Sequence, residues 1–157
     1  MKIFDMRDYC REDFDALASL YQRSKGDEFR FESGWPERFP VIPLPCDEHR
    51  LKAFSNASAL VLPAEKGLAG AIYWQGGHIV GLLVDPSSRG MGLGRAMVRE
   101  VLGRMEETAT LEVVASNRPA VRLYESLGFW RVGPRDRAYQ GVPVTVLMMK
   151  CPLSERL

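Results

Sequence analysis

The chain has 157 residues, of which 46% are hydrophobic and 26% charged, and its formal net charge is +1. A chain of this length and composition is expected to fold as a single domain, residues 1–157, around its own core. The near-zero net charge gives no chain-wide attraction to nucleic acid or to an acidic membrane surface, so neither is expected as a partner.

The three cysteines, Cys10, Cys46 and Cys151, lie far apart and show no CxxC spacing. This pattern argues against a disulfide framework and a structural zinc site, so we expect free thiols and no metal. The N-terminus lacks an apolar signal region, and no stretch approaches the ~20 apolar residues that span a bilayer. The sequence therefore predicts a cytoplasmic protein.

Residues 2–7 are expected to form a first strand, ahead of an amphipathic helix over residues 12–23. In residues 26–46 the periodicity disappears. A segment of about twenty residues without regular structure inside a compact domain is usually functional or disordered. Its aromatic residues argue against disorder. These residues lie among four prolines and are Phe29, Phe31, Trp35 and Phe39.

The rest of the chain alternates between helical and strand patterns. Gly76-Gly77 between two apolar runs indicates a hairpin, and 141–143 marks a second turn near the C-terminus. This order predicts a mixed α/β sheet. The expected helices cover residues 47–55, 93–107 and 118–127, and the expected strands cover residues 59–63, 68–74, 79–84, 111–115, 129–132 and 142–149.

A glycine-rich turn joins the strand that ends near Val84 to the helix that follows. Its glycines are Gly90, Gly92 and Gly94, and apolar residues then recur at helical spacing. Backbone N–H groups at such a turn converge at a helix N-terminus, where the helix dipole favours an anion. The turn lacks the third glycine of a dinucleotide fingerprint and the Gly-Lys-Ser/Thr of a P-loop. It therefore predicts a phosphate or pyrophosphate site of another kind.

A second motif follows about 25 residues later. A strand over 111–115 leads to Asn117, a good helix N-cap, and Gly128-Phe129 ends the helix. Together the two motifs resemble those of the GCN5-related N-acetyltransferases. The glycine loop of that family is matched by Arg89, Gly92 and Gly94, and its second segment by Asn117, Ala120, Leu123-Tyr124 and Gly128-Phe129. The resemblance is close over residues 59–150 and holds only in outline over residues 1–58.

The resemblance implies a mostly antiparallel sheet of six to seven strands with about four helices. In the family, the fourth and fifth strands splay apart to admit the pantetheine arm of acetyl-CoA. Residues 59–150 would bind the coenzyme, and residues 1–58 would face the acceptor. The implied coenzyme contacts are the strand backbone at Leu82, Leu83 and Val84, the loop residues Arg89, Gly90, Met91, Gly92, Leu93, Gly94 and Arg95, and Asn117 and Tyr124.

The same resemblance assigns catalytic roles. Tyr124 matches the tyrosine whose hydroxyl protonates the departing thiolate. Two residues compete as the base. His78 stands where the family often carries a glutamate, and a histidine is a competent base near neutral pH. Glu112 lies in a segment similar to that of the ribosomal-protein alanine acetyltransferases, which use a glutamate there.

The expected reaction is direct transfer, in a ternary complex, to a small-molecule amine or amino acid. A peptide N-terminus is the alternative acceptor, and a non-catalytic acyl-CoA-binding regulatory module is the alternative function. The sequence is compatible with a monomer or a homodimer. Two interpretations of the aromatic residues in 26–46 stay open, contact with an apolar part of the acceptor or closure of the core. Two interpretations of the nearby acidic residues also stay open, attraction of a cationic amine or solvation in the loop; these residues are Asp27, Glu28, Glu32 and Glu37.

Overall fold

A computed structural model describes residues 4–152, through which runs a seven-stranded sheet of order β1-β2-β3-β4-β5-β7-β6. Neighbouring strands are antiparallel except for β4 and β5, which are parallel. The strands are β1 (Arg7–Asp8), β2 (Ser58–Pro63), β3 (Leu68–Gln75), β4 (His78–Val84), β5 (Ala109–Val114), β6 (Trp130–Tyr139) and β7 (Val142–Cys151).

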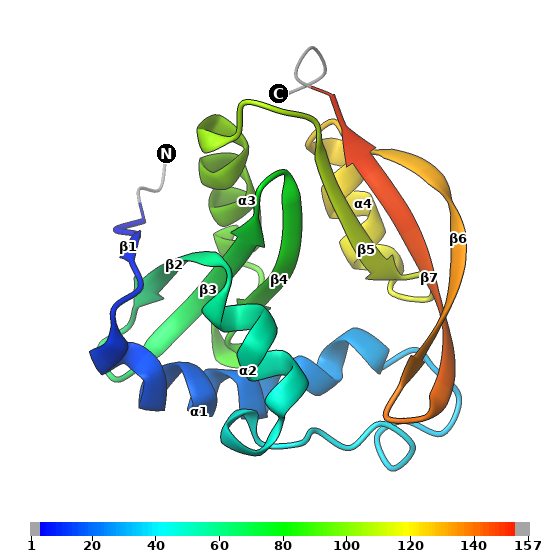
Figure 1. Cartoon of the computed structure of the whole chain (residues 1–157), viewed down its shortest axis with the longest axis horizontal. Coiled ribbons are helices and arrows are strands. Elements are labelled where there is room, and N and C mark those ends of the chain that lie inside the picture. Colours follow the sequence, from blue (N-terminus) through cyan, green and yellow to red (C-terminus); the bar gives the residue numbers. More distant parts are fainter. Residues whose placement is uncertain (1–3, 153–157) are drawn as a thin grey trace.

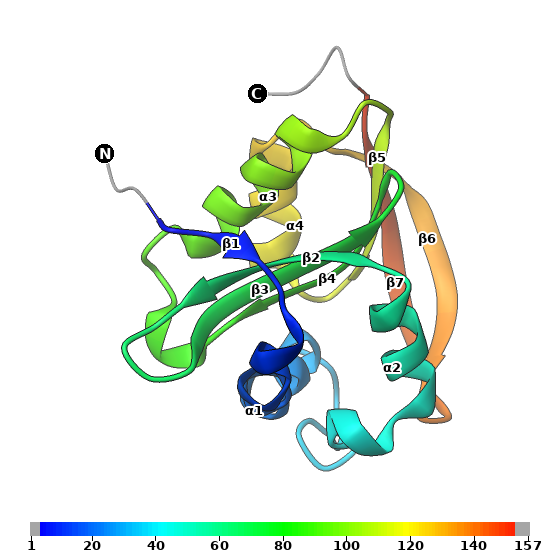
Figure 2. The same cartoon turned by 60° about the vertical axis from the view of Figure 1, so that its left-hand side comes forward.

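Helices cover both faces of the sheet, with α1 (Phe14–Ser24) and α2 (Glu48–Ser55) on one side and α3 (Leu93–Arg104) and α4 (Arg118–Ser126) on the other (Figures 1 and 2). Successive strand residues point to opposite faces. Leu60 and Ile72 accordingly join the core under α3 and α4, whereas Val61 and Ala71 join the core against α1. The two apolar layers fix the sheet between the helix pairs.

The strands β4 and β5 separate almost as soon as they meet (Figure 1). Their one registered pair is His78 with Thr110, whose N–H donates to the Gly77 carbonyl at 2.8 Å. A bulge sits in β4 just beyond this point, because Tyr73 pairs with Gly81 while the next residue of β3 pairs with Ile79. The predicted fold class and its splayed strands are confirmed. The extra residue of the bulge is Val80, immediately before Gly81.

Gly81 is required by close packing at this bulge. A Cβ atom there would lie 2.3 to 2.5 Å from atoms of the Tyr73 phenol ring. The ring therefore occupies the space of the missing side chain, so Tyr73 packs directly against β4 at the bulge.

Several expected boundaries differ from those in the structure. Of the strand expected over residues 2–7, residues 2 and 3 lie outside the described part, residues 4–6 are not strand, and pairing starts only at Arg7. The helix expected to reach residue 107 ends at Arg104, because Met105 is extended. The strand expected to end at residue 132 continues to Tyr139. It turns at Gln140-Gly141, where both residues have positive φ, as in a type I′ hairpin.

The segment 26–46 folds against the β6–β7 hairpin. Two short 3-10 helices, η2 (Lys25–Phe29) and η3 (Leu44–Cys46), frame it. Phe29 and Phe39 stack with ring centroids 4.7 Å apart, and both join a small core with Tyr139. These two aromatic residues thus close the core, as one of the two interpretations expected. The other two are exposed, Phe31 to 52% and Trp35 to 36%.

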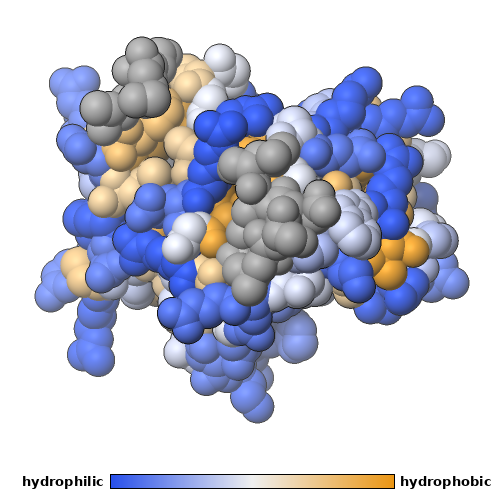
Figure 3. Space-filling model, turned by 90° about the horizontal axis from the view of Figure 1, so that it is seen from above, coloured by the Kyte–Doolittle hydropathy of each residue, from blue (hydrophilic) through white to orange (hydrophobic). Residues whose placement is uncertain are grey.

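Seen from above in Figure 3, the surface is largely hydrophilic, and its apolar residues stand in small separate groups. Within residues 4–152, no helix combines the length and apolar character needed to cross a membrane.

Candidate active site

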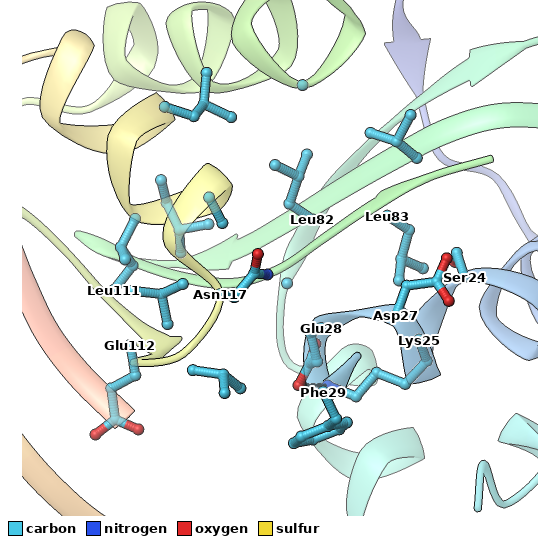
Figure 4. A pocket seen from close by; sticks show the side chains of 18 of the residues that line it. Ser24, Lys25, Asp27, Glu28, Phe29, Leu82, Leu83, Leu111, Glu112 and Asn117 are labelled. Atoms are coloured by element: carbon cyan, nitrogen blue, oxygen red, sulfur yellow. Dashed lines mark hydrogen bonds and ion pairs between the residues drawn. The ribbon is translucent and has the colours of Figure 1, made fainter. Parts of the chain in front are cut away.

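A cavity of about 730 Å³ opens where β4 and β5 part. Both strands line it, together with the glycine loop, the first turn of α4, η2, α2 and the β6–β7 hairpin. Figure 4 shows η2 side chains facing Leu82 of β4 and Glu112 of β5 across this space. The splay of the sheet therefore creates a site reached by both halves of the chain.

The glycine loop enters α3 through two left-handed residues. Gly90 and Gly92 have φ of 80° and 84°, and a Cβ on either would meet nothing within 4 Å. The backbone conformation, and not crowding, therefore requires glycine at these positions. The first amides of α3, those of Leu93, Gly94 and Arg95, have no acceptor within the helix and lie at its positive end. This arrangement suits a pyrophosphate.

Two ion pairs tie the glycine loop to the N-terminal half of the chain. Asp85 accepts a hydrogen bond from the Ser87 N–H at 3.2 Å and pairs with Arg23 of α1 at 3.0 Å. Arg89 pairs with Asp27 of η2 at 2.5 Å. The guanidinium of Arg89, which we expected to contact the coenzyme, is therefore already paired with the carboxylate of Asp27.

Other predicted coenzyme contacts are also located by the structure. Arg95 lines the cavity, whereas Met91 does not and is 45% exposed. Leu82, Leu83 and Val84 pair with β3 on one edge only, since β5 is in register with β4 at His78 alone. The other edge of β4 therefore offers backbone groups to the cavity, as the expected contact with pantetheine requires.

Asn117 occupies the N-cap position of α4, but its side chain makes no capping hydrogen bond. The residue is 7% exposed, and its Oδ1 atom is buried without a hydrogen-bond partner among the described residues. Figure 4 shows the carboxamide pointing into the cavity between Leu82 and Glu28. An unpaired buried amide oxygen costs free energy, so a ligand that donates a hydrogen bond there would be stabilised.

Tyr124 of α4 lines the same cavity and packs edge-on against Phe129, with centroids 5.7 Å apart. Burial raises the pKa of Tyr124 well above its ordinary value because it disfavours the phenolate, and the negative charge of Glu28 adds to the rise. The hydroxyl therefore stays protonated, which is the state a proton donor needs.

Both predicted bases line the cavity, but different partners hold them. His78 Nδ1 lies 2.8 Å from Thr110 Oγ1 at the closed end of the splay. The Glu112 carboxylate accepts two hydrogen bonds from Arg137 of β6, one from Nη2 at 2.5 Å and one from Nε at 3.3 Å. The fork-like contact occupies both carboxylate oxygens of Glu112.

The N-terminal half contributes residues that the sequence did not single out. Lys25 and Arg50 line the cavity, and neither belongs to a motif or a periodic pattern. Of the four acidic residues considered for the amine, Asp27 and Glu28 are lining residues and the other two are not. Of the four aromatic residues of the segment, only Phe29 lines the cavity.

Residues 14–129 match the model of the acetyltransferase (GNAT) family. The match covers more than half of the chain, which therefore belongs to this family. The glycine loop, the splayed strands and the tyrosine of α4 all fall within the matched residues.

Each of these relatives by sequence matches less than half of the chain. A mycothiol acetyltransferase from Thermomonospora curvata is 46% identical over 70 residues, which are 42% of this chain and 23% of that protein. The Escherichia coli (strain K12) enzyme named [Ribosomal protein bS18]-alanine N-acetyltransferase is 44% identical over 82 residues, 46% of this chain and 53% of that protein. The matches thus span about half or less of these curated relatives.

Solved structures agree over nearly the whole fold. The crystal structure of the ribosomal-protein-S18-alanine N-acetyltransferase from Escherichia coli superimposes with a TM-score of 0.72 at 23% identity, covering 96% of this chain and 94% of that one. A putative acetyltransferase from Salmonella typhimurium, described with its cofactor acetyl-CoA, gives 0.68 at 16% identity, with 99% and 97% covered. At such identities the likeness concerns the fold.

Proposed function

We propose that this chain is an N-acetyltransferase that moves an acetyl group from acetyl-CoA to a primary amine. The observation that carries the proposal is the meeting of two features in one cavity. The glycine loop at the N-terminus of α3 lines it from one side, and the buried side chain of Tyr124 lines it from α4. Membership of the GNAT family and the fold of an acetyl-CoA-bound neighbour support the choice of donor.

The proposed reaction is a direct transfer within a ternary complex. Acetyl-CoA supplies a thioester carbonyl, with its pyrophosphate at the α3 N-terminus and its arm along the free edge of β4. The amine nitrogen bonds to the carbonyl carbon, and the carbon–sulfur bond breaks. Tyr124 gives its proton to the leaving sulfur, and His78 or Glu112 takes the proton released by the amine. The cavity brings all three side chains to one space.

The first candidate for the acceptor is a small-molecule amine or amino acid. A peptide N-terminus is the second candidate, which the 44% identity to the Escherichia coli alanine N-acetyltransferase over 82 residues favours. Residues 1–58 supply η2 and α2 on the acceptor side of the cavity.

The test is a thiol-release assay with acetyl-CoA across amines, amino acids, polyamines and N-terminal peptides. We expect Tyr124→Phe to lower kcat by about 100-fold while coenzyme affinity, measured by calorimetry, stays unchanged. Tyr9→Phe is the matched control because Tyr9 lies outside the cavity, and it should retain the wild-type kcat.

An unaltered kcat in Tyr124→Phe would remove its assignment as the acid. Tight coenzyme binding without turnover on any amine would point instead to a non-catalytic acyl-CoA-binding module.

A further inference from the structure

The end of the cavity formed by η2, α2 and the β6–β7 hairpin holds more positive than negative side chains. Its three carboxylates are each held in an ion pair: Asp27 with Arg89 at 2.5 Å, Glu28 with Lys25 at 2.8 Å, and Glu112 with Arg137 at 2.5 Å. The cations that line this end are Lys25, Arg30, Arg50 and Arg137. A positive excess therefore remains.

Arg50 accounts for much of this excess. Among residues 4–152, no carboxylate lies within ion-pair distance of its guanidinium. The nearest acidic residue in sequence, Asp47, is used otherwise, because its Oδ1 caps α2 by accepting the Arg50 backbone N–H at 3.1 Å. Arg30, in contrast, lies against the Phe31 ring and donates to the Asp27 carbonyl.

Lys25 places a second cation in the same region. The Lys25 side chain is only 10% exposed, and its ammonium lies 5.9 Å from the ring centroids of both Phe29 and Tyr139. Burial lowers the pKa of Lys25, Glu28 raises it, and the charge of Arg50 lowers it again. Arg50 and Lys25 thus act on each other electrostatically, and an anion between them would relieve the repulsion.

The charged side chains at this end of the cavity interact electrostatically with one another and with Tyr124. The negative charge of Glu28 acts on the Tyr124 hydroxyl, Glu28 is bonded to Lys25, and the charge of Arg50 acts on Lys25. Arg50 also acts on Tyr73 of β3 and Tyr139 of β6, whose rings border the same space. The Glu28 carboxylate, which is bonded to Lys25, thus lines one cavity together with Arg50 and Tyr124.

We propose that this end of the cavity binds the carboxylate of the acceptor, which is therefore an amino acid. Arg50 and Lys25 bind the carboxylate, and Glu28 receives the amine side, which leaves the nitrogen near Tyr124. The inference rests on the proposed function and narrows its acceptor class. A peptide N-terminus lacks a carboxylate next to its amine, and a polyamine would bring further positive charge to Arg50.

The test compares each of the twenty amino acids with its primary amide, which keeps the amine and removes the negative charge. With the full-length protein and saturating acetyl-CoA, we expect the best amino acid to exceed its amide in kcat/KM by at least about 10-fold. Arg50→Gln should raise KM for the acid about 10-fold or more and raise KM for the amide by clearly less. Arg50→Lys should restore part of the preference because it restores the charge.

Arg99→Gln is the matched control, since Arg99 is exposed on α3 and does not line the cavity. Acid and amide reacting equally well in the wild-type protein would overturn the inference while leaving the proposed function intact. An equal loss for acid and amide in Arg50→Gln would also overturn it, because that result indicates a structural role.

A binding measurement keeps the inference testable if no acceptor is turned over. Calorimetric titration of the coenzyme-A-loaded protein with the same acids and amides should then show tighter binding of an acid, lost in Arg50→Gln. Equal binding of every acid and its amide would overturn the carboxylate subsite independently of catalysis.

Discussion

At the residue scale, the two candidate bases, His78 and Glu112, differ in how many of their proton-accepting atoms already have a hydrogen-bond partner. Arg137 already engages both oxygens of Glu112, whereas His78 uses only Nδ1, which lies beside the Thr110 hydroxyl. When Nδ1–H donates to that hydroxyl, Nε2 carries a lone pair that can accept a proton. The geometry therefore favours His78 as the base.

We expect His78→Gln to remove the limb of the pH–rate profile that rises with pH and to lower kcat/KM by about 100-fold. Glu112→Gln should keep the rising limb. The measurement is kcat/KM against pH for the wild type and both variants with one amine. If the limb disappears in Glu112→Gln instead, the base is Glu112, and persistence in both variants would assign neither.

Residues within the two motifs could be predicted because their chemistry is local. The glycine-rich turn before α3 and the N-cap position of Asn117 follow from short segments, whereas the resemblance to a family predicted that Asn117 and Tyr124 face the coenzyme site. The partners of predicted residues could not be found in this way. Asp27 meets Arg89, and Arg137 meets Glu112, only because distant elements converge on the cavity.

At the element scale, the start of α3 is set by a backbone conformation that glycine alone adopts readily. Gly92 precedes the helix with φ of 84°, and Gly103 lies exposed in its last turn with open space around a Cβ position. Replacing each glycine with alanine should therefore change the free energy of unfolding in opposite directions at the two sites.

Gly92→Ala should lower the free energy of unfolding by about 1 to 2 kcal/mol, because an alanine in the left-handed region is strained. It should also weaken coenzyme binding, since the loop amides would shift. Gly103→Ala should raise the free energy of unfolding by about 0.5 kcal/mol, because alanine has a higher helix propensity than glycine. Urea denaturation of both variants measures the free energy of unfolding, and calorimetric titration with coenzyme A measures the affinity for the coenzyme. Equal effects at the two sites would contradict the conformational argument.

The longer elements were predictable from periodicity, and the short or irregular ones were not. Helix α1 carries an apolar pattern that one buried face imposes, whereas β2 to β5 carry apolar runs because helices cover both faces of the sheet. β1 has two residues, which is too short for a pattern, and both are exposed. β6 carries Gly133, Pro134 and charged residues with little burial, so its pairing with β7 sets its length.

At the scale of the whole molecule, the order of the sheet follows from the two halves of the chain meeting along β4 and β5. The sequence predicted this splay through its resemblance to a family. The small core beside the cavity depends on Phe29 and Phe39 packing against Tyr139, a contact between segments about 100 residues apart. No local pattern encodes such a contact, so whether these aromatic residues serve the core or a ligand stayed open.

The N-terminal region is joined to α1 by an ion pair that should make stability depend on pH. Arg7 Nη1 and Nη2 donate to the two oxygens of Asp13 at 2.7 Å each, and the Cys10 N–H donates to Oδ2 at 2.9 Å. The Arg7 hydrogen bonds, with the Cys10 N–H, hold the pKa of Asp13 well below its ordinary value. Asp13 is 7% exposed, so water replaces these partners poorly.

The sign of the effect follows from proton binding. In the unfolded chain Asp13 takes up a proton as pH falls below about 3.9, whereas in the folded protein it stays ionised to lower pH. Its contribution is therefore fully present above that pH and is lost as pH decreases further. Asp13→Asn should lower the free energy of unfolding at pH 7 by about 1 to 3 kcal/mol and flatten the acid limb below pH 4.

Urea denaturation at half-unit steps from pH 7 to pH 3 measures this dependence. Glu65→Gln is the control, because Glu65 is exposed in the turn between β2 and β3. The control should reproduce the acid limb of the wild type, since the other carboxylates still contribute to it. An Asp13→Asn curve parallel to the wild type from pH 7 to pH 3 would show that this ion pair does not couple folding to protonation.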